Sequence, residues 1–264
     1  VNHDAMRAAK EIAEARRRGM KLVVIDPICS PIASKADQWV PIRPGTDGAL
    51  ALSLMHVLVN ELGAYDRSFL QSQTNAAYLV GADGRYLRHE KSAKPLIWDE
   101  QTEQAWPFNK SSSPALEGMF TVNGQSCEPA FAKLKKHLHS FAPEQVAEMT
   151  TVPAAQIRQI ARDFGEAANL GGTIVMEGKS MPYRPVCSFC DSRGLSSHQF
   201  GMWACMSVHM LNLIVGALDV PGGCLSTNIL GPGEKLRVGE SSDGLVVGPG
   251  DVRSYPPRHP SRPE

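Results

Sequence analysis

The stretch "KLVVIDPICSPIASKADQWVPIRPGTDGAL", residues 21–50, decides the fold because it places two acidic turns around one short strand. Its opening "KLVVID" is a short apolar and β-branched run without alternation, which predicts a parallel strand buried on both faces. A second short strand is expected over residues 38–42. The turn "RPGTDG" then leads into a helix that we expect Asp47 to cap and that runs to about Leu62.

The segment before this stretch, residues 1–19, has helical periodicity and ends at Gly19, a typical helix stop. Helix, strand and acidic turn together form half of a dinucleotide-binding unit. The sequence therefore predicts the α/β class, with one domain built on a dinucleotide-binding-like parallel sheet. Because a domain of this class opens here on a helix, we also expect the chain to be an internal piece of a longer protein.

Changes in composition divide the chain. Residues 1–170 are expected to form a partial dinucleotide-fold domain, with a loop-rich insertion at about 78–128 that is marked by turn residues. After a glycine doublet, residues 171–230 are expected to form part of a neighbouring α/β domain with a second βα unit. Residues 231–264 are rich in Gly and Pro and predict an irregular segment.

Local patterns add detail to this division. "FTVNGQSC" predicts a hairpin with Asn123 and Gly124 in its turn. Helical periodicity occurs in residues 130–139 and 151–168, and an apolar helix is expected to end near Leu218.

Composition excludes several classes of protein. Of the 264 residues, 42% are hydrophobic, which is enough for a sizeable core. Lys plus Arg and Asp plus Glu both number 27, so no net charge attracts nucleic acid or an anionic membrane. Six irregularly spaced cysteines do not indicate a disulfide scaffold. The sequence also contains no run of eighteen apolar residues that would predict a transmembrane helix.

The two acidic turns suggest a nucleotide. Asp26 directly follows the first strand, where a carboxylate can accept hydrogen bonds from the hydroxyls of a ribose. In the second turn, Gly45 permits close backbone approach, and Asp47 can accept both the ring N–H and the amino group of guanine. The alternatives, that Asp26 merely ends a strand and that Asp47 is only a helix cap, remain open. Neither a GxGxxG motif after a strand nor a P-loop motif is present.

Other residues carry weaker signals. Cys187 and Cys190 in "CSFC" have zinc or redox spacing but no second matched pair, so incidental thiols are favoured over a metal site. We expect His56 to face solvent and His209 to lie in the core. His198 lies at a loop-to-helix junction, where it could face a ligand or serve only the structure.

The opening stretch resembles the molybdopterin oxidoreductases of the dimethyl sulfoxide reductase superfamily, whose members carry "IDP", then a Ser or Thr, "AD" and "RPGTDxAL". The resemblance continues through "YDRSFLQSQTN", "DGRYLR", "KPLIWD", "VPAAQIRQIARDF", "SSHQFG" and "LNLIVGALDVPGG". It covers about residues 4–228. It implies a cofactor in which molybdenum or tungsten is held by two pyranopterins, each extended by a guanosine diphosphate, that is, bis-molybdopterin guanine dinucleotide.

The resemblance also implies residue roles. One guanosine end would be held by residues of the two turns: Asp26, Pro27, Ser30, Arg43, Gly45, Thr46 and Asp47. "SSHQFG" is similar to a segment that often reads His, any residue, Asn, Gly, which implies that His198, Gln199 and Gly201 bind cofactor. Phe200 stands in the Asn position and Ile28 replaces a common basic residue, so a pterin contact and a phosphate contact are in doubt.

In this superfamily a four-Cys iron–sulfur module and the metal ligand lie outside the region matched here, so neither a catalytic residue nor a metal ligand is assigned to this chain. The resemblance implies the catalytic part of an oxidoreductase of anaerobic respiration, which passes electrons to an iron–sulfur electron-transfer subunit; a membrane anchor subunit is a further expected partner. A small molecule is the expected substrate, and the chain resembles the polysulfide, thiosulfate and tetrathionate reductases, or their hydratase and hydroxylase neighbours, more than it resembles nitrate reductases. A periplasmic or membrane-associated complex is expected, with a cytoplasmic one as the other option. Two alternatives are a stand-alone guanine-nucleotide-binding domain and a non-catalytic scaffold subunit.

Overall fold

The computed structural model describes residues 3–190, 194–224, 239–240 and 246–247, with side chains from residue 10 to residue 224. The chain forms two compact units, Val1–Leu225 and Ser226–Glu264. Of the second unit, the structure describes the antiparallel pair β10 (Gly239–Glu240) and β11 (Val246–Val247). The rest of the segment predicted to be irregular lies outside the described residues. The predicted domain boundary near residue 171 stays a prediction.

The first unit opens with the predicted helix and parallel pair, which confirms the α/β class. The elements are α1 (His3–Arg17), β1 (Val23–Ile25) and β2 (Gln38–Val40), with a short 3-10 helix η1 (Ala33–Lys35) between the strands. Asp37 ties them together, since its carboxylate accepts hydrogen bonds from the Arg16 guanidinium and from the backbone N–H of Leu22, both at 2.8 Å.

The prediction that the first strand is buried on both faces is wrong. In the two-stranded sheet of β1 and β2, Val23 and Val24 are only partly buried and Ile25 is 37% exposed, so neither face of β1 is fully covered. The apolar run of β1 correctly indicated a parallel strand. What the run could not indicate is how many neighbours cover the strand in this chain.

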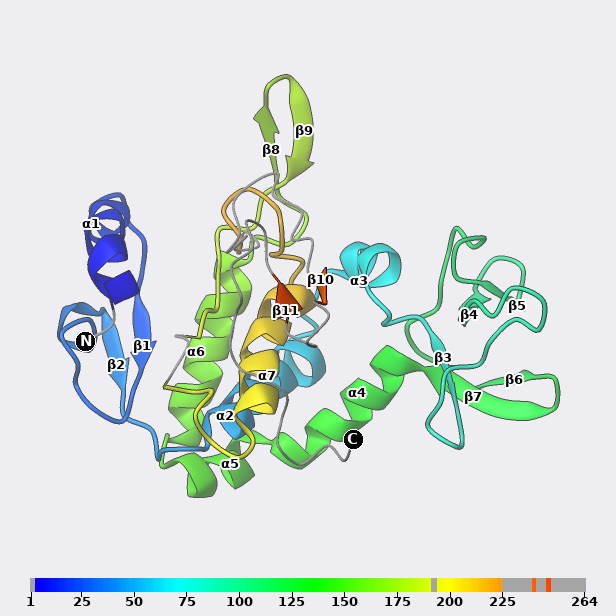
Figure 1. The fold of residues 1–264 in the computed structure, drawn as a ribbon, viewed down its shortest axis with the longest axis horizontal. Coiled ribbons are helices and arrows are strands. Elements are labelled where there is room, and N and C mark those ends of the chain that lie inside the picture. Colours follow the sequence, from blue (N-terminus) through cyan, green and yellow to red (C-terminus); the bar gives the residue numbers. More distant parts are fainter. Residues whose placement is uncertain (1–2, 191–193, 225–238, 241–245, 248–264) are drawn as a thin grey trace. The chain divides into compact units, whose positions relative to one another are not determined.

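The core of the first unit surrounds α2, which contacts four other α-helices and the 3-10 helix between two of them (Figure 1). α2 spans Asp47–His56 and continues as a π-helical turn, η2 (Val57–Glu61), which confirms the helix predicted to run to about Leu62. The helices that contact it are α4 (Ala130–Leu138), α5 (Pro143–Thr150), α6 (Ala154–Ala167) and α7 (Gly201–Ile214). A 3-10 helix, η3 (His139–Phe141), joins α4 to α5.

Because neighbours cover α2 on several sides, the prediction that His56 faces solvent is wrong. His56 is only 7% exposed, and its Nδ1 lies 3.1 Å from the amide nitrogen of Asn60. Its ring contacts the ring of His139 edge to face, with centroids 5.6 Å apart. Burial lowers the pKa of His56 below its usual value.

We expect this burial to make stability depend on pH. The folded pKa of His56 lies below the unfolded value, so the unfolded chain takes up the proton first. Its contribution to stability is therefore complete above about pH 6.5 and is lost as the pH falls through the lower folded pKa. The free energy of unfolding, measured with urea between about pH 7.5 and about pH 5, should depend less on pH in His56→Gln than in wild type. The same change at the exposed His137 should leave the dependence as it is, and equal slopes in all three proteins would contradict the assignment.

The segment predicted to be a loop-rich insertion contains short antiparallel strands, and its place as an insertion in the domain stays a prediction. One sheet has the order β3 (Leu79–Gly81), β7 (Gln125–Pro129), β6 (Phe120–Val122), and a second pairs β4 (Leu96–Asp99) with β5 (Gln104–Pro107). Asn123 and Gly124 both have positive φ, 51° and 76°, in the β6–β7 turn, which confirms the predicted hairpin. A short helix, α3 (Arg67–Gln73), precedes the insertion.

After α6 the chain forms a hairpin of β8 (Thr173–Met176) and β9 (Lys179–Pro182). The strand over 173–176 and the helix that follows it are confirmed, but β8 pairs antiparallel with β9, a strand that the sequence did not predict. The turn residues Glu177 and Gly178 have positive φ, 50° and 75°, which suits a tight two-residue turn. The apolar helix α7 ends at Ile214, four residues before the predicted end.

Candidate functional site

Asp26 lies at the carboxyl end of β1, where its backbone is bound to β2 on both sides of the residue. Its N–H donates to the Val40 carbonyl at 3.2 Å, and its own carbonyl accepts from the indole N–H of Trp39 at 2.8 Å. The carboxylate Oδ1 accepts from the N–H of Ile28 at 2.9 Å. The first acidic turn is thus a defined structure that holds one carboxylate at a strand end.

The second turn is held by Arg43 and Thr46. The Thr46 hydroxyl donates to the Arg43 carbonyl at 2.7 Å, while the backbone N–H of Arg43 donates to the carbonyl of Thr150 at 3.0 Å. Gly45 between them has φ +80°, and a Cβ there would meet nothing within 4 Å. Gly45 therefore supplies a left-handed conformation beside open space, as the sequence predicted for a backbone that a ligand approaches.

Asp47 is the first residue of α2, and Thr46 is the cap, so the prediction that Asp47 caps the helix is wrong by one position. Asp47 is half-buried, and burial raises its pKa above the usual carboxyl value. The nearby charge of Asp26 raises this pKa further, and that of His198 lowers it. Asp26 and His198 therefore both lie within electrostatic reach of Asp47, although 172 positions of sequence separate them from each other.

The first turns of α2 and α7 meet without an intervening side chain. A Cβ on Gly48 would lie 3.3 Å from the Cα of Ala204, so glycine is what allows this approach. α7 itself begins at Gly201, whose N–H donates to the His198 carbonyl at 2.8 Å. Since helix N-termini carry partial positive charge, two such ends beside Asp47 favour an anionic or polarised ligand.

The remaining residues predicted to bind cofactor are more exposed or make weaker hydrogen bonds. Pro27 and Gln199 are exposed, and the Ser30 hydroxyl accepts from the N–H of Ala33 at 3.4 Å in the turn that leads to η1. Ile28 and Phe200 are 74% and 67% exposed. Their apolar side chains provide no hydrogen bond to a ligand at these two positions, as the sequence indicated.

Sequence reasoning missed Trp39 and Gly48. Trp39 gave a signal, because an indole on a short strand between two acidic turns needs a partner for its N–H. Gly48 gave little signal in the sequence, since only the packing of α2 on α7 reveals why a side chain would not fit there.

The cysteine segment does not join this group. Burial of the thiol and the neighbouring Cys224 raise the pKa of Cys187 to about 12. The sulfur of Cys190 lies 3.4 Å from Nε2 of His209. His209 is exposed, so the prediction that it lies in the core is wrong. Among the described residues there is no group of three or more His, Cys, Asp or Glu side chains that could hold a metal.

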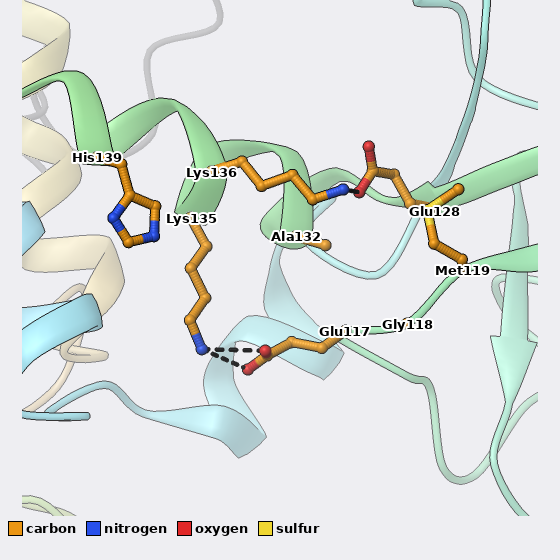
Figure 2. Close-up of a pocket in the computed structure, with 8 residues that line it drawn as sticks. All are labelled: Glu117, Gly118, Met119, Glu128, Ala132, Lys135, Lys136 and His139. Carbon is orange, nitrogen blue, oxygen red and sulfur yellow. Dashed lines mark hydrogen bonds and ion pairs between the residues drawn. The ribbon is translucent and has the colours of Figure 1, made fainter.

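A cavity of about 300 Å³ lies beside α4 in the region of the insertion (Figure 2). Lys135 reaches both carboxylate oxygens of Glu117 at 3.0 Å, and Lys136 pairs with Glu128 (Figure 2). Because a carboxylate neutralises each ammonium group, this cavity offers little attraction to an anion. The two acidic turns and the helix ends beside them are the better candidate site.

Within the described part of the chain, none of the helices has the length and apolar character needed to cross a membrane.

Comparison with known proteins identifies a family and several relatives of this chain. The family described as "Molybdopterin oxidoreductase" matches residues 2–251. A sulfite dehydrogenase subunit of Allochromatium vinosum is 32% identical over 237 residues, which cover 80% of this chain and 24% of that protein. The alpha subunit of perchlorate reductase from Dechloromonas aromatica is 34% identical over 200 residues, or 59% of this chain and 22% of that protein.

Among solved structures, acetylene hydratase from Pelobacter acetylenicus aligns with 82% of this chain at 22% identity, with a TM-score of 0.44. The chain spans less than a quarter of the length of the two curated relatives just described. The family match, by contrast, extends over nearly the whole sequence and includes both acidic turns. The chain therefore belongs to the molybdopterin oxidoreductase family.

Proposed function

We propose that this chain forms a guanosine-binding part of the catalytic subunit of a molybdenum or tungsten oxidoreductase. The observation that carries the proposal is the contact of the first turns of α2 and α7 at Gly48 and Ala204, beside Asp47, whose pKa the charges of Asp26 and His198 both affect. Three segments that are distant in the sequence thus converge on one place, and all three contain residues of the family motifs.

The residues present fit the guanosine end of molybdopterin guanine dinucleotide. Asp47 can accept two hydrogen bonds from the ring N–H and amino group of guanine, which adenine cannot supply in that arrangement. The carboxylate of Asp47 is half-buried and has a raised pKa, and hydrogen-bond donors from guanine would stabilise its charged form. Asp26 would accept from the ribose hydroxyls. Gly45 and the two helix ends would face the diphosphate.

When bound, the cofactor supplies the metal that exchanges an oxygen atom or two electrons with substrate. This chain's own part is to bind and orient the cofactor's nucleotide. His198 is close enough to Asp47 to assist at the same end, and Thr46 and Arg43 hold the backbone of the second turn.

For the whole protein we propose oxygen-atom transfer to or from a small oxyanion or sulfoxide. The names of the relatives support this, since they include a sulfite dehydrogenase and reductases of perchlorate, chlorate and selenate. The assignment to the polysulfide, thiosulfate and tetrathionate group stays a prediction. Relatives whose names mark them as one component of a larger enzyme support a complex with further subunits, for which an iron–sulfur electron-transfer protein is our candidate.

The proposal is tested by measuring the guanine nucleotide and the metal bound to the purified full-length protein. Acid treatment should release a guanine nucleotide, and elemental analysis of the same sample should find molybdenum or tungsten. A protein with neither would support the alternative of a scaffold subunit. Tight binding of guanosine diphosphate by this polypeptide alone, without metal in the full-length protein, would support the stand-alone nucleotide-binding domain.

A further inference from the structure

We propose that Trp39 is a positioning residue that orients Asp26 toward the ribose and sets its spacing from Asp47. This inference rests on the proposed function, because it concerns how this chain recognises the nucleotide. Trp39 does not itself need to touch the ligand; it acts through the backbone of Asp26.

The geometry begins with the register of the parallel pair. Val24 lies opposite Trp39, and Ile25 lies opposite Val40, the last pair of the sheet. One residue further, the N–H of Asp26 still reaches the Val40 carbonyl at 3.2 Å. Strand β2 ends at Val40, so the carbonyl of Asp26 lies beyond the last backbone hydrogen bond of the parallel pair. The indole N–H of Trp39 binds that carbonyl at 2.8 Å and takes the place of a missing ladder bond.

This bond restricts where the carboxylate of Asp26 can point. With its N–H and its carbonyl both bound to adjacent residues of β2, Asp26 has little freedom to rotate its peptide planes. One carboxylate oxygen, Oδ1, accepts from the N–H of Ile28 at 2.9 Å. A carboxylate accepts up to about four hydrogen bonds, so Oδ2 can accept from a ligand hydroxyl.

The same strand leads to the second acidic turn. β2 ends at Val40, and Asp47 begins α2 seven residues later. Trp39 therefore ties the first turn to the strand from which the second turn starts. Asp26 is close enough to Asp47 for its charge to raise the pKa of Asp47. A change in the spacing of the two carboxylates would therefore change the affinity for a ligand that contacts both.

Packing alone does not account for this indole. Trp39 is 38% exposed, so its ring buries less apolar surface than a core Trp would. A phenyl ring could replace most of that contact, but it could not donate to the Asp26 carbonyl. The bond, rather than the ring, is what the position requires.

The experiment uses the full-length protein prepared without cofactor and measures calorimetric binding of guanosine diphosphate and its 2′,3′-dideoxy analogue. Wild type should prefer the natural nucleotide by about tenfold, as expected for one hydrogen bond to a charged group. Trp39→Phe should bring that ratio close to one. Its preference for guanosine diphosphate over adenosine diphosphate, which depends on Asp47, should remain.

Trp106→Phe is a matched control, because Trp106 is 37% exposed and its indole N–H donates to the Thr102 hydroxyl at 3.0 Å, in the insertion. This control should keep the wild-type ratio. The proposal is overturned if Trp39→Phe also keeps it, or if wild type binds both guanosine nucleotides equally. Failure of the proposed function has a different signature, since wild type would then not distinguish guanosine from adenosine diphosphate.

Discussion

Replacing Arg184 with alanine is expected to lower the free energy of unfolding by about 3–5 kcal/mol, because it leaves a mostly buried carboxylate without its partner. The guanidinium NH2 of Arg184 lies 2.7 Å from Oδ2 of Asp66, and the two side chains are only 5% and 14% exposed. The other terminal nitrogen, NH1, donates to the carbonyls of Asn169, Gly172 and Tyr183. The change would therefore also remove donors from three backbone groups.

Urea unfolding followed by circular dichroism measures the effect. The matched control is Arg67→Ala, which removes an ion pair with Glu100 at 2.9 Å whose side chains are 47% and 44% exposed. Solvent screens that pair, so its loss should cost about 1 kcal/mol or less. If the two variants lose equal stability, the Arg184 pair is not the buried clamp that its geometry indicates.

Replacing Asp47 with alanine in the full-length protein is expected to weaken cofactor binding by roughly 1.5–3 kcal/mol, the value of a charged acceptor lost by a buried base. This corresponds to roughly ten- to a hundredfold in affinity, so the variant should be isolated with less metal. Elemental analysis for molybdenum and tungsten after purification measures it. Asp47→Asn, which keeps the shape but loses the charge, should give an intermediate result.

Asp83→Ala is the control for this prediction. Asp83 is an exposed acid in the insertion whose Oδ1 accepts from the N–H of Arg85 at 3.0 Å. Its loss should leave the metal content unchanged. A wild-type metal content in Asp47→Ala would remove Asp47 from the guanine site, whatever the fate of the other assignments.

Most elements of the site could be predicted because each carries its own local signal. A β-branched run followed by Asp26 indicated a strand and its end, and Gly45 indicated a turn with positive φ. The turn of Asn123 and Gly124 was equally local. These predictions needed no knowledge of which segments meet.

Most of the predictions that failed depend on tertiary contacts. Helical periodicity separates the faces of α2 and α7, but it does not say which face another helix covers. Hence His56 was expected in solvent and is buried, while His209 was expected in the core and is exposed. The approach of His198 to Asp47 depends on the contact at Gly48. The bond of Trp39 to Asp26 depends on strand register.

The π-helical turn at Val57–Glu61 has a consequence for how sequence changes can be tolerated. A π turn takes up one residue more than an α turn, so each side chain beyond it faces the direction that a regular helix would give to the residue one position earlier. Glu61 at its end lies 2.9 Å from Arg158 of α6, and Asp47 at the other end faces the site. Deleting one residue within the π turn would restore a regular helix and leave Glu61 on the face of Arg158, whereas inserting one residue would turn Glu61 away by about 100°. The length of this helix is thus set by both of its ends at once, and a single-residue deletion at the π turn is expected to be tolerated better than an insertion.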